Sequence, residues 1–250
     1  PDKVSFSPGG PRESTLKRWR SEGLGPDADW FDALCAEIGI APDRSASPRT
    51  PLGISLTMMP EFEEKVLERK DGHLVVQDAS GAHVEISDVY DFSYLRSARD
   101  FVTRRWHKFP VETRDDWKEM RRRYDPAAAS RYPADIAAVA RALKDRDYVC
   151  GLTIAGPFWK LRDWCGFENL CMMMATDPGF VEEMAGFWRE FVLAVLEPFL
   201  AAGIVLDYVI YNEDMAYKEK SMVSPAMARR FLSPSWRSWT DRLNRSGCRC

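Results

Sequence analysis

The sequence predicts an α/β fold in which parallel strands alternate with long helices. In the second half, the stretches 148–155 and 204–211 are apolar enough to be strands, and helical patterns follow both. Strands separated by long helices pair in parallel, and a strand that is apolar throughout is typical of one covered on both faces. With the shorter candidates 4–7 and 52–58, four parallel strands are expected. Because a (β/α)8 barrel of the TIM type needs eight strands, the chain is expected to provide about half of such a barrel, which is therefore incomplete.

The first half adds helices and a hairpin to this plan. Apolar residues on one face predict helices over 12–22 and 29–38, and two further helices are expected over 114–124 and over the alanine-rich stretch 134–144. Alternating apolar residues on both sides of a turn at 78–81 predict a β-hairpin over 74–86. We expect this hairpin, within 62–88, to be an insertion that decorates the main sheet.

The helices of the second half have clear start signals. The pairs Asp-Pro at 177–178 and Ser-Pro at 224–225 each combine a side chain that caps a helix N-terminus with a proline that suits its first turn. The two helices that begin there are expected to end at Gly203 and Gly247. One further helix is expected over about 159–175.

Length and composition allow a single domain with a large core. The chain has 250 residues, of which 45% are hydrophobic, and its formal net charge is −3. Without a basic bias, a nucleic-acid-binding face is not expected, and no apolar run of about 18 residues predicts a membrane span. The six cysteines contain no C-x-x-C pair, which favours reduced thiols and a cytoplasmic location. Neither nucleic acid nor a membrane is therefore expected as a partner.

Both ends of the chain have the character of cut ends. The first residue is Pro1 rather than Met, and the last is Cys250, three residues after the helix-ending Gly247. We therefore expect a single barrel domain over 1–250 that is truncated at both ends, as an N-terminal fragment would be. Half a barrel leaves strand edges unpaired, so the isolated chain is expected to expose apolar surface.

The active site of an α/β barrel lies at the C-terminal ends of its strands. Glu213 and Asp214 directly follow the strand at 204–211. A carboxylate at such a rim can bind or protonate a substrate, although the same pair could cap the next helix or lie in solvent. Arg12 follows a Gly-Pro turn after the strand at 4–7, and a surface role is equally open to it. We select Glu213, Asp214 and Arg12 as candidate catalytic residues.

The segments around the two stronger strands also contain candidates for substrate binding. They are Trp159, Arg162, Asp163, Trp164, Tyr211 and Asn212. Arg162 and Asp163 either form a local ion pair or leave the arginine to bind a carboxylate of the substrate. The two tryptophans are either packing residues or faces for a flat substrate.

Residues spaced as metal ligands are scarce. The three histidines, His73, His83 and His107, form no ligand pair. Cys248 and Cys250 supply two soft ligands, which is too few for a zinc site. We therefore expect no complete metal site, and no cofactor, within this chain.

Five segments occur in a distinctive order along the chain. They are 13–24, the Gly-Pro-aromatic turn within 154–159, the Thr-Asp-Pro at 176–178, 202–211, and 224–234 with its Ser-Pro and later Phe and Pro. In order and spacing these segments resemble the uroporphyrinogen decarboxylase superfamily, and in particular a divergent branch related to corrinoid-dependent methyltransferases. The resemblance spans nearly the whole chain and implies a (β/α)8 barrel.

The resemblance implies one of two chemistries. One is the cofactor-free decarboxylation of the acetate arms of a tetrapyrrole in porphyrin biosynthesis. The other is methyl transfer between a corrinoid and a thiol, with zinc held by an H-x-C pair and a later Cys. Three departures from the family pattern argue against the housekeeping decarboxylase. Of an arginine-rich loop only Arg12 remains, Trp164 replaces a substrate-binding tyrosine, and Glu213 replaces a serine.

The departures favour corrinoid-linked methyl transfer, with a tetrapyrrole or corrinoid as substrate and a corrinoid protein as a further partner. Corrinoid and zinc would then belong to the full-length protein, because the H-x-C pair would fall just after Cys250. Two alternatives stay open, namely decarboxylation of a carboxylated tetrapyrrole and corrinoid binding without catalysis. In each case we expect Arg12, Trp164 and Glu213 to face one cleft.

Overall fold

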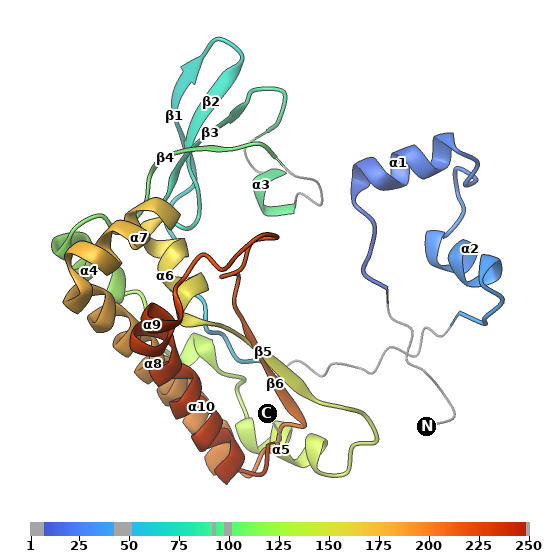
Figure 1. Ribbon diagram of the computed structural model, residues 1–250. Helices are drawn as coiled ribbons and strands as arrows, with labels where there is room; N and C mark the ends of the chain where they lie inside the picture. The colour runs from blue at the N-terminus through green and yellow to red at the C-terminus, as the bar shows by residue number, and fades with distance from the viewer. Residues whose placement is uncertain (1–7, 43–51, 92–93, 98–101, 249–250) are drawn as a thin grey trace.

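The chain is a mixed α/β protein, as the sequence predicts. A computed structural model describes residues 8–42, 52–91, 94–97 and 102–248 (Figure 1). The described strands form two separate sheets, an antiparallel one of four strands and a parallel one of two. Helices α1 (Glu13–Ser21) and α2 (Trp30–Glu37) stand to one side of the remaining elements in every ribbon view.

The antiparallel sheet contains the predicted hairpin. Its order is β1 (Lys65–Lys70), β2 (His73–Gln77), β3 (His83–Ser87) and β4 (Arg105–Lys108). β2 and β3 confirm the hairpin expected over 74–86, with Val76 opposite Val84. The inward side chains of both strands form a small core of their own, against which the short helix α3 (Tyr94–Ser97) packs.

The two stronger strand predictions are also confirmed. β5 (Gly151–Ala155) and β6 (Tyr208–Asn212) are neighbours and run parallel. The ring of Tyr208 occupies the space that a side chain at Gly151 would need. Just before the strands, the Asp207 carboxylate accepts hydrogen bonds from the Cys150 N–H and from Arg146 Nη2, each at 2.7 Å. Within the described residues this sheet has no third strand, so a closed barrel is not seen there.

The segment 52–58 is not a strand, and that prediction is wrong. Its carbonyl groups bind a buried arginine instead of a neighbouring strand. Arg131 Nη1 donates to the carbonyl oxygens of Ser55 at 3.2 Å and of Thr57 at 2.6 Å. In return, the Ser55 N–H donates to the Arg131 carbonyl oxygen at 2.9 Å. The apolar ends of the segment are buried all the same, so its composition reflects burial rather than strand pairing. The remaining strand candidate, 4–7, lies outside the described residues.

The four helices predicted in the first half are confirmed, with ends shifted by up to three residues. Besides α1 and α2 they are α4 (Arg114–Arg121) and α5 (Ile136–Lys144). α4 begins with a capping box, in which Thr113 and Asp116 each bind a backbone N–H of the other. A short 3-10 turn, Ala129–Arg131, connects the two helices and carries the buried Arg131.

In the second half, the single helix predicted over 159–175 is wrong. The chain forms α6 (Pro157–Cys165) and α7 (Phe167–Thr176), separated by Gly166 at a φ of 77°. The predicted starts of the later helices are confirmed, at α8 (Pro178–Ala201) and at α9 (Pro225–Met227), which continues through a π-helical turn, Ala228–Leu232, into α10 (Ser233–Arg245). The ring of Phe109 lies against Gly166 where a side chain would stand, and a left-handed φ favours glycine.

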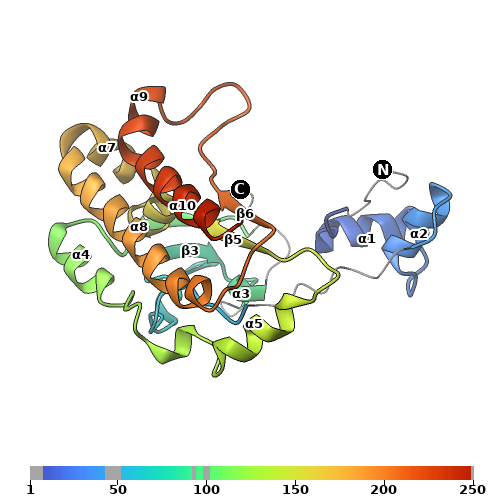
Figure 2. The ribbon, with the colours of Figure 1, turned by 90° about the horizontal axis from the view of Figure 1, so that it is seen from below.

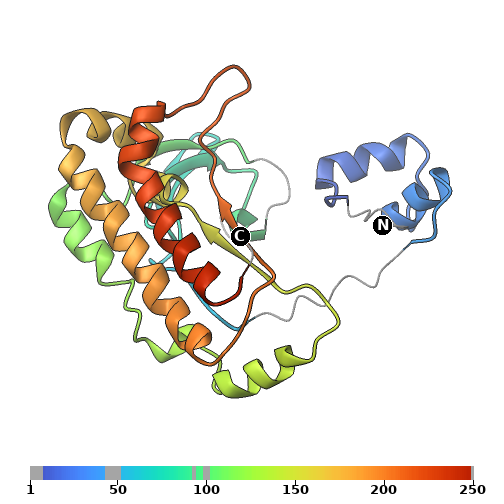
Figure 3. The ribbon, with the colours of Figure 1, turned by 60° about the horizontal axis from the view of Figure 1, so that its bottom comes forward.

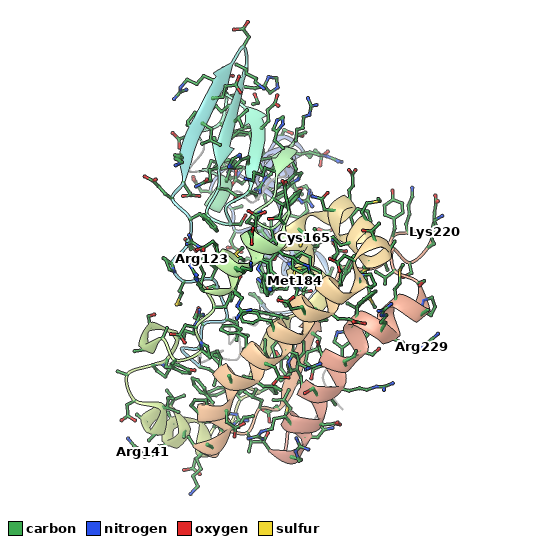
Figure 4. All side chains as sticks on the ribbon, turned by 90° about the vertical axis from the view of Figure 1, so that its left-hand side faces the viewer. Arg123, Arg141, Cys165, Met184, Lys220 and Arg229 are labelled. Atoms are coloured by element: carbon green, nitrogen blue, oxygen red, sulfur yellow. The ribbon has the colours of Figure 1, made fainter. Side chains whose placement is uncertain are left out.

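The main core gathers around α8, which contacts α5, α6, α7 and α10. Figure 2 and Figure 3 show α8 and α10 side by side along one side of the parallel pair. Where α8 meets α6, Cys165 and Met184 point toward one another (Figure 4), with their sulfur atoms 3.8 Å apart. Among the described helices, none combines the length and the apolar character needed to cross a membrane.

Candidate functional site

A cleft of about 1470 Å³ lies at the C-terminal end of β5, bordered by α6, α7, β4 and the segment 56–61. Thr153 and Ala155 of β5 line it, and the C-terminal ends of parallel strands are where α/β proteins bind ligands. Typical pockets for small molecules measure about 300–1,000 Å³. The cleft therefore has room for a ligand that is larger than usual.

The apolar lining of the cleft consists of aromatic rings and methionines. Trp106 and Phe109 stack with ring centroids 5.0 Å apart. The other such residues of the lining are Met58, Met120, Tyr124, Trp164, Phe167, Met172, Met173 and Trp188. Aromatic faces and adaptable thioethers suit a broad ligand that is flat in part.

The charged residues of the lining are of both signs. The basic ones are Arg104, Lys160 and Arg162, with His107 in addition, and the acidic ones are Glu61, Asp78, Glu112, Asp163 and Glu168. Carboxylates thus outnumber the lysine and arginine side chains. A ligand with many carboxylates would meet at least as much repulsion as attraction here.

Lys160 is a charged side chain of this lining that lies mostly within the protein. Its side chain is 15% exposed, with Asp163 at 3.7 Å and the ring centroid of Trp188 at 5.0 Å from Nζ. Burial lowers the pKa of Lys160, against the opposing effect of Asp163. Burial likewise raises the pKa of Asp163, against the opposing effects of Lys160 and Arg162. Both shifts favour the uncharged forms, which makes the pair suited to proton transfer.

Arg162 forms an ion pair with Asp214 and not with Asp163, the partner considered from the sequence. Its Nη1 lies 2.9 Å from Asp214 Oδ2, so the pair joins α6 to the loop after β6. The guanidinium carbon also lies 4.8 Å from the ring centroid of Trp159. Three candidates from sequence, Trp159, Arg162 and Asp214, are therefore brought together, with Arg162 on the cleft lining.

Glu213 caps the N-terminus of α6, which precedes it in the sequence, and not the next helix along the chain. Its Oε2 accepts from the Trp159 N–H at 2.9 Å, and its Oε1 accepts from the Phe158 N–H at 3.3 Å and from Trp236 Nε1 at 3.1 Å. The carboxylate lies against Gly156, where no side chain would fit. Burial raises the pKa of Glu213, although these three hydrogen bonds act in the opposite direction. A negative charge at a helix N-terminus is stabilising, and Glu213 is not among the described residues that line the cleft.

Trp164 is fully buried at the boundary between the cleft and the core. Its Nε1 donates to the Tyr124 hydroxyl at 3.1 Å, and its ring packs against Trp117 and Trp188. Burial raises the pKa of Tyr124 to about 12. This set of rings gives the cleft a rigid wall.

The other candidates lie elsewhere. The Tyr211 hydroxyl is 3.0 Å from Thr240 Oγ1 of α10, and its ring packs on Trp239. The carbonyl oxygen of Asn212 accepts from the Gly156 N–H at 2.9 Å. Arg12 precedes α1, which stands away from the parallel pair (Figure 1). The structure thus does not bring Arg12 and Glu213 into one cleft with Trp164.

Lys160 was not among the candidates from sequence, although one signal pointed to it. In a helix beginning at Pro157, position 160 shares a face with Pro157 and Trp164, three residues before it and four after. Both of these are buried. A lysine on the buried face of a helix rarely occurs without a partner or a function.

Comparison with known proteins gives no further guide. No protein-family model, characterised protein or solved structure matches this chain.

Proposed function

We propose that the cleft binds a corrinoid and that the chain is part of an enzyme of corrinoid-linked methyl transfer, built on a barrel of the (β/α)8 type. The observation that carries this proposal is the cleft itself, about 1470 Å³ in volume and lined by five aromatic rings besides Tyr124. A tetrapyrrole-like macrocycle is a broad ligand with flat faces, and such walls suit it. The resemblance in sequence order to the uroporphyrinogen decarboxylase superfamily supports the same class of ligand.

The charges of the lining favour a corrinoid over a porphyrinogen with many carboxylates. The arms of a corrinoid end mainly in neutral amides, which accept and donate hydrogen bonds to side chains of either sign. The lining offers both kinds, with Arg104 and Arg162 as donors and Glu61 and Glu168 as acceptors. A polycarboxylate would need an excess of basic groups, which the described lining does not provide.

A bound corrinoid supplies a transferable methyl group. In this chain, Trp106 and Phe109 would hold a face of the macrocycle, and Trp164 would form part of the aromatic wall of the cleft. Lys160 and Asp163 would exchange a proton with the methyl acceptor, since burial shifts the pKa of each toward its uncharged form. No step is assigned to zinc, because within the described residues no three His, Cys, Asp or Glu side chains lie where they could hold a metal ion together, and Cys250 lies outside these residues.

Equilibrium dialysis with methylcobalamin tests the binding step. We expect saturable binding that Trp106→Ala weakens about tenfold, equivalent to about 1.4 kcal/mol. Trp19→Ala is the matched control, since this tryptophan lies on α1 and does not line the cleft. Equal affinities of the two variants, or no binding, would refute the cleft as the site.

Loss of the methyl–cobalt absorbance in the presence of a thiol tests methyl transfer itself. Binding without any loss of this absorbance would favour the non-catalytic corrinoid-binding alternative. A corrinoid protein offered as donor in place of methylcobalamin tests whether such a partner is preferred.

The free thiols of Cys35, Cys150, Cys165 and Cys171 are in keeping with a cytoplasmic protein.

Decarboxylation of a carboxylated tetrapyrrole is the second candidate, and the Lys160–Asp163 pair favours it. This reaction needs a proton donor for the carbon that loses carbon dioxide, and an acid of raised pKa such as Asp163 can supply the proton. The measurement is the appearance of products with fewer carboxyl groups from uroporphyrinogen. Turnover that Asp163→Asn abolishes would support this activity in place of methyl transfer.

A further inference from the structure

Lys160 lies on the inward face of α6 and also lines the cleft. The side chain leaves the first turns of α6 on the face that also carries Pro157 and Trp164, and this face is turned into the protein. The Nζ atom lies 5.0 Å from the ring centroid of Trp188, on the neighbouring helix α8. At the same time Lys160 lines the large cleft. The amine is thus removed from bulk water yet open to a ligand.

Asp163, the carboxylate that lies beside Lys160 among the described residues, does not hold it as a strong ion pair. Asp163 Oδ2 is 3.7 Å from Nζ, longer than the 2.7–2.9 Å of a charge-assisted hydrogen bond. Asp163 also lines the cleft. Burial shifts the pKa of the lysine down and the pKa of the aspartate up. The amine therefore keeps its lone pair more often than an exposed lysine does, and lysines desolvated in this way act as nucleophiles.

We propose that Lys160 is a nucleophilic amine that forms an imine with an aldehyde or ketone bound in the cleft, and that Asp163 moves the protons of this reaction. The amine nitrogen attacks the carbonyl carbon, and one of its two protons passes by way of Asp163 to the carbonyl oxygen, which gives a carbinolamine. Asp163 in its acid form then donates a proton to the departing hydroxyl, a carbon–nitrogen double bond forms, and water leaves. The nitrogen loses its second proton to the Asp163 carboxylate, so that atoms and charges balance and no oxidant or reductant is needed.

The chain contains a matched comparison for this lysine. Lys118 of α4 also pairs with an aspartate three positions away, Asp115, at 2.7 Å. The side chain of Lys118 is 67% exposed, against 15% for Lys160. The two pairs share their residue types and a three-residue spacing, in opposite order along the chain, so a difference in reactivity between them reports the burial of Lys160 together with its longer ion pair.

Reductive trapping tests the proposal on the whole chain. The protein is incubated near pH 7 with propionaldehyde and cyanoborohydride, which reduces an imine but leaves the aldehyde, and the labelled lysines are identified by peptide mass spectrometry. We expect Lys160 to be labelled severalfold faster than Lys118, since burial lowers the pKa of Lys160 and so raises its fraction of neutral amine. Labelling of Lys160 at the rate of Lys118, or more slowly, would overturn the proposal.

Two variants separate the roles of the pair. Lys160→Met should lose the fast label while Lys118 is labelled as before, and its thermal unfolding shows whether it folds. Asp163→Asn keeps the amine and should slow its labelling severalfold without moving the label to another lysine. Unchanged labelling in Asp163→Asn would remove the aspartate from the proposal. The trapping experiment contains no corrinoid, so its outcome is independent of the function proposed above.

Discussion

Arg131 and Lys160 are both cations withdrawn from solvent, but their surroundings differ. Arg131 is 0% exposed, and its guanidinium donates four hydrogen bonds of 2.6–3.2 Å, to carbonyl oxygens of Ser55, Thr57, Arg123 and Asp125. Lys160 has one carboxylate at 3.7 Å and an aromatic ring. A planar guanidinium suits converging carbonyl groups, whereas an ammonium group shifts its pKa readily. Burial alone therefore does not distinguish the two cations, whereas the number of acceptors around each of them does.

Replacement of Arg131 should have the largest effect on stability. Arg131→Met leaves the carbonyl oxygens of Ser55 and Thr57 without their donor, and each unsatisfied buried group costs ~1–3 kcal/mol. We expect the free energy of unfolding to fall by about 4 kcal/mol in total. Urea titration followed by tryptophan fluorescence measures this loss.

Two further variants make the result specific. Arg141 projects from α5 into solvent (Figure 4), with a side chain that is 71% exposed, so Arg141→Met should change the free energy by less than about 0.5 kcal/mol. Arg131→Lys should recover only part of the loss, because an ammonium group cannot reproduce the planar set of donors. Equal losses for Arg131→Met and Arg141→Met would erase the distinction drawn between the two buried cations.

Replacement of Glu213 should have the next largest effect on stability, since Glu213, like Arg131, has several hydrogen-bond partners. Glu213→Ala removes the acceptor for the Phe158 and Trp159 N–H groups and for Trp236 Nε1. We expect a loss of about 3 kcal/mol, combining unsatisfied donors with a lost helix cap. Asp214→Ala is the control, because an ion pair at the surface contributes roughly 0–1 kcal/mol. Unfolding by urea again gives both values, and a smaller loss for Glu213→Ala than for Asp214→Ala would contradict the capping role.

The sign of a pH effect at Glu213 follows from its pKa, which burial raises in the folded state. Between its unfolded pKa, about 4.3, and the higher folded value, the folded protein binds more protons than the unfolded one. The contribution of Glu213 to stability therefore falls as pH rises through this window. Relative to Glu213→Gln, the wild type should be more stable at the acid side of the window than at neutral pH. A difference that stays constant over this range would refute the direction of the shift.

Tyr124 extends the comparison to an uncharged group and should have a smaller effect. Tyr124→Phe leaves Trp164 Nε1 without its acceptor at the wall of the cleft. We expect a loss of ~1–2 kcal/mol, the cost of one unsatisfied buried donor. Tyr217→Phe, at an exposed tyrosine, should leave stability nearly unchanged. Thermal unfolding compares the two, and a loss in Tyr217→Phe as large as in Tyr124→Phe would show that the hydrogen bond to Trp164 is not the cause.

The partners of buried polar groups also explain which parts of the fold could be predicted from the sequence. The stretches 52–58 and 148–155 are both apolar, and both were predicted to be strands. The second contains β5, because β6 offers it a parallel partner. The first is irregular, because Arg131, more than 70 positions away, binds its carbonyl groups. Periodicity predicts which residues are buried, but the partner of the backbone is set by contacts distant in sequence.

The sequence predicted where the candidate site lies better than it predicted which residues form it. The segment after β5 does line the cleft, through Arg162, Asp163 and Trp164. Adjacent carboxylates at the end of β6 suggested chemistry, yet Glu213 turned out to cap α6. The sequence shows where a strand ends, but it does not show how many N–H groups donate to a carboxylate at that end. The donors to Glu213 are set by how α6 and α10 pack against β6.

Of these replacements, Lys160→Met should have the smallest effect on stability, and it should increase the free energy of unfolding. At pH 7 a buried ammonium group with one distant partner costs stability, and Met fills a similar volume without charge. We expect the free energy of unfolding to rise by about 1 kcal/mol, while the matched Lys118→Met changes it little. Asp163 tolerates the loss of its partner because its side chain is 43% exposed, so solvent can still surround the carboxyl group. Chemical unfolding at several pH values gives the difference between each variant and the wild type.

The pH dependence of this gain identifies its cause. The pKa of Lys160 is lowered in the folded state, while the unfolded lysine titrates near its ordinary value of about 10.4. Between these values the unfolded chain binds more protons, so the wild type becomes more stable as pH rises. The advantage of Lys160→Met should therefore shrink from pH 7 toward pH 10. If Lys160→Met instead loses stability at pH 7, and by the same amount at every pH, then Lys160 is a satisfied structural cation, and it belongs with Arg131 rather than in contrast to it.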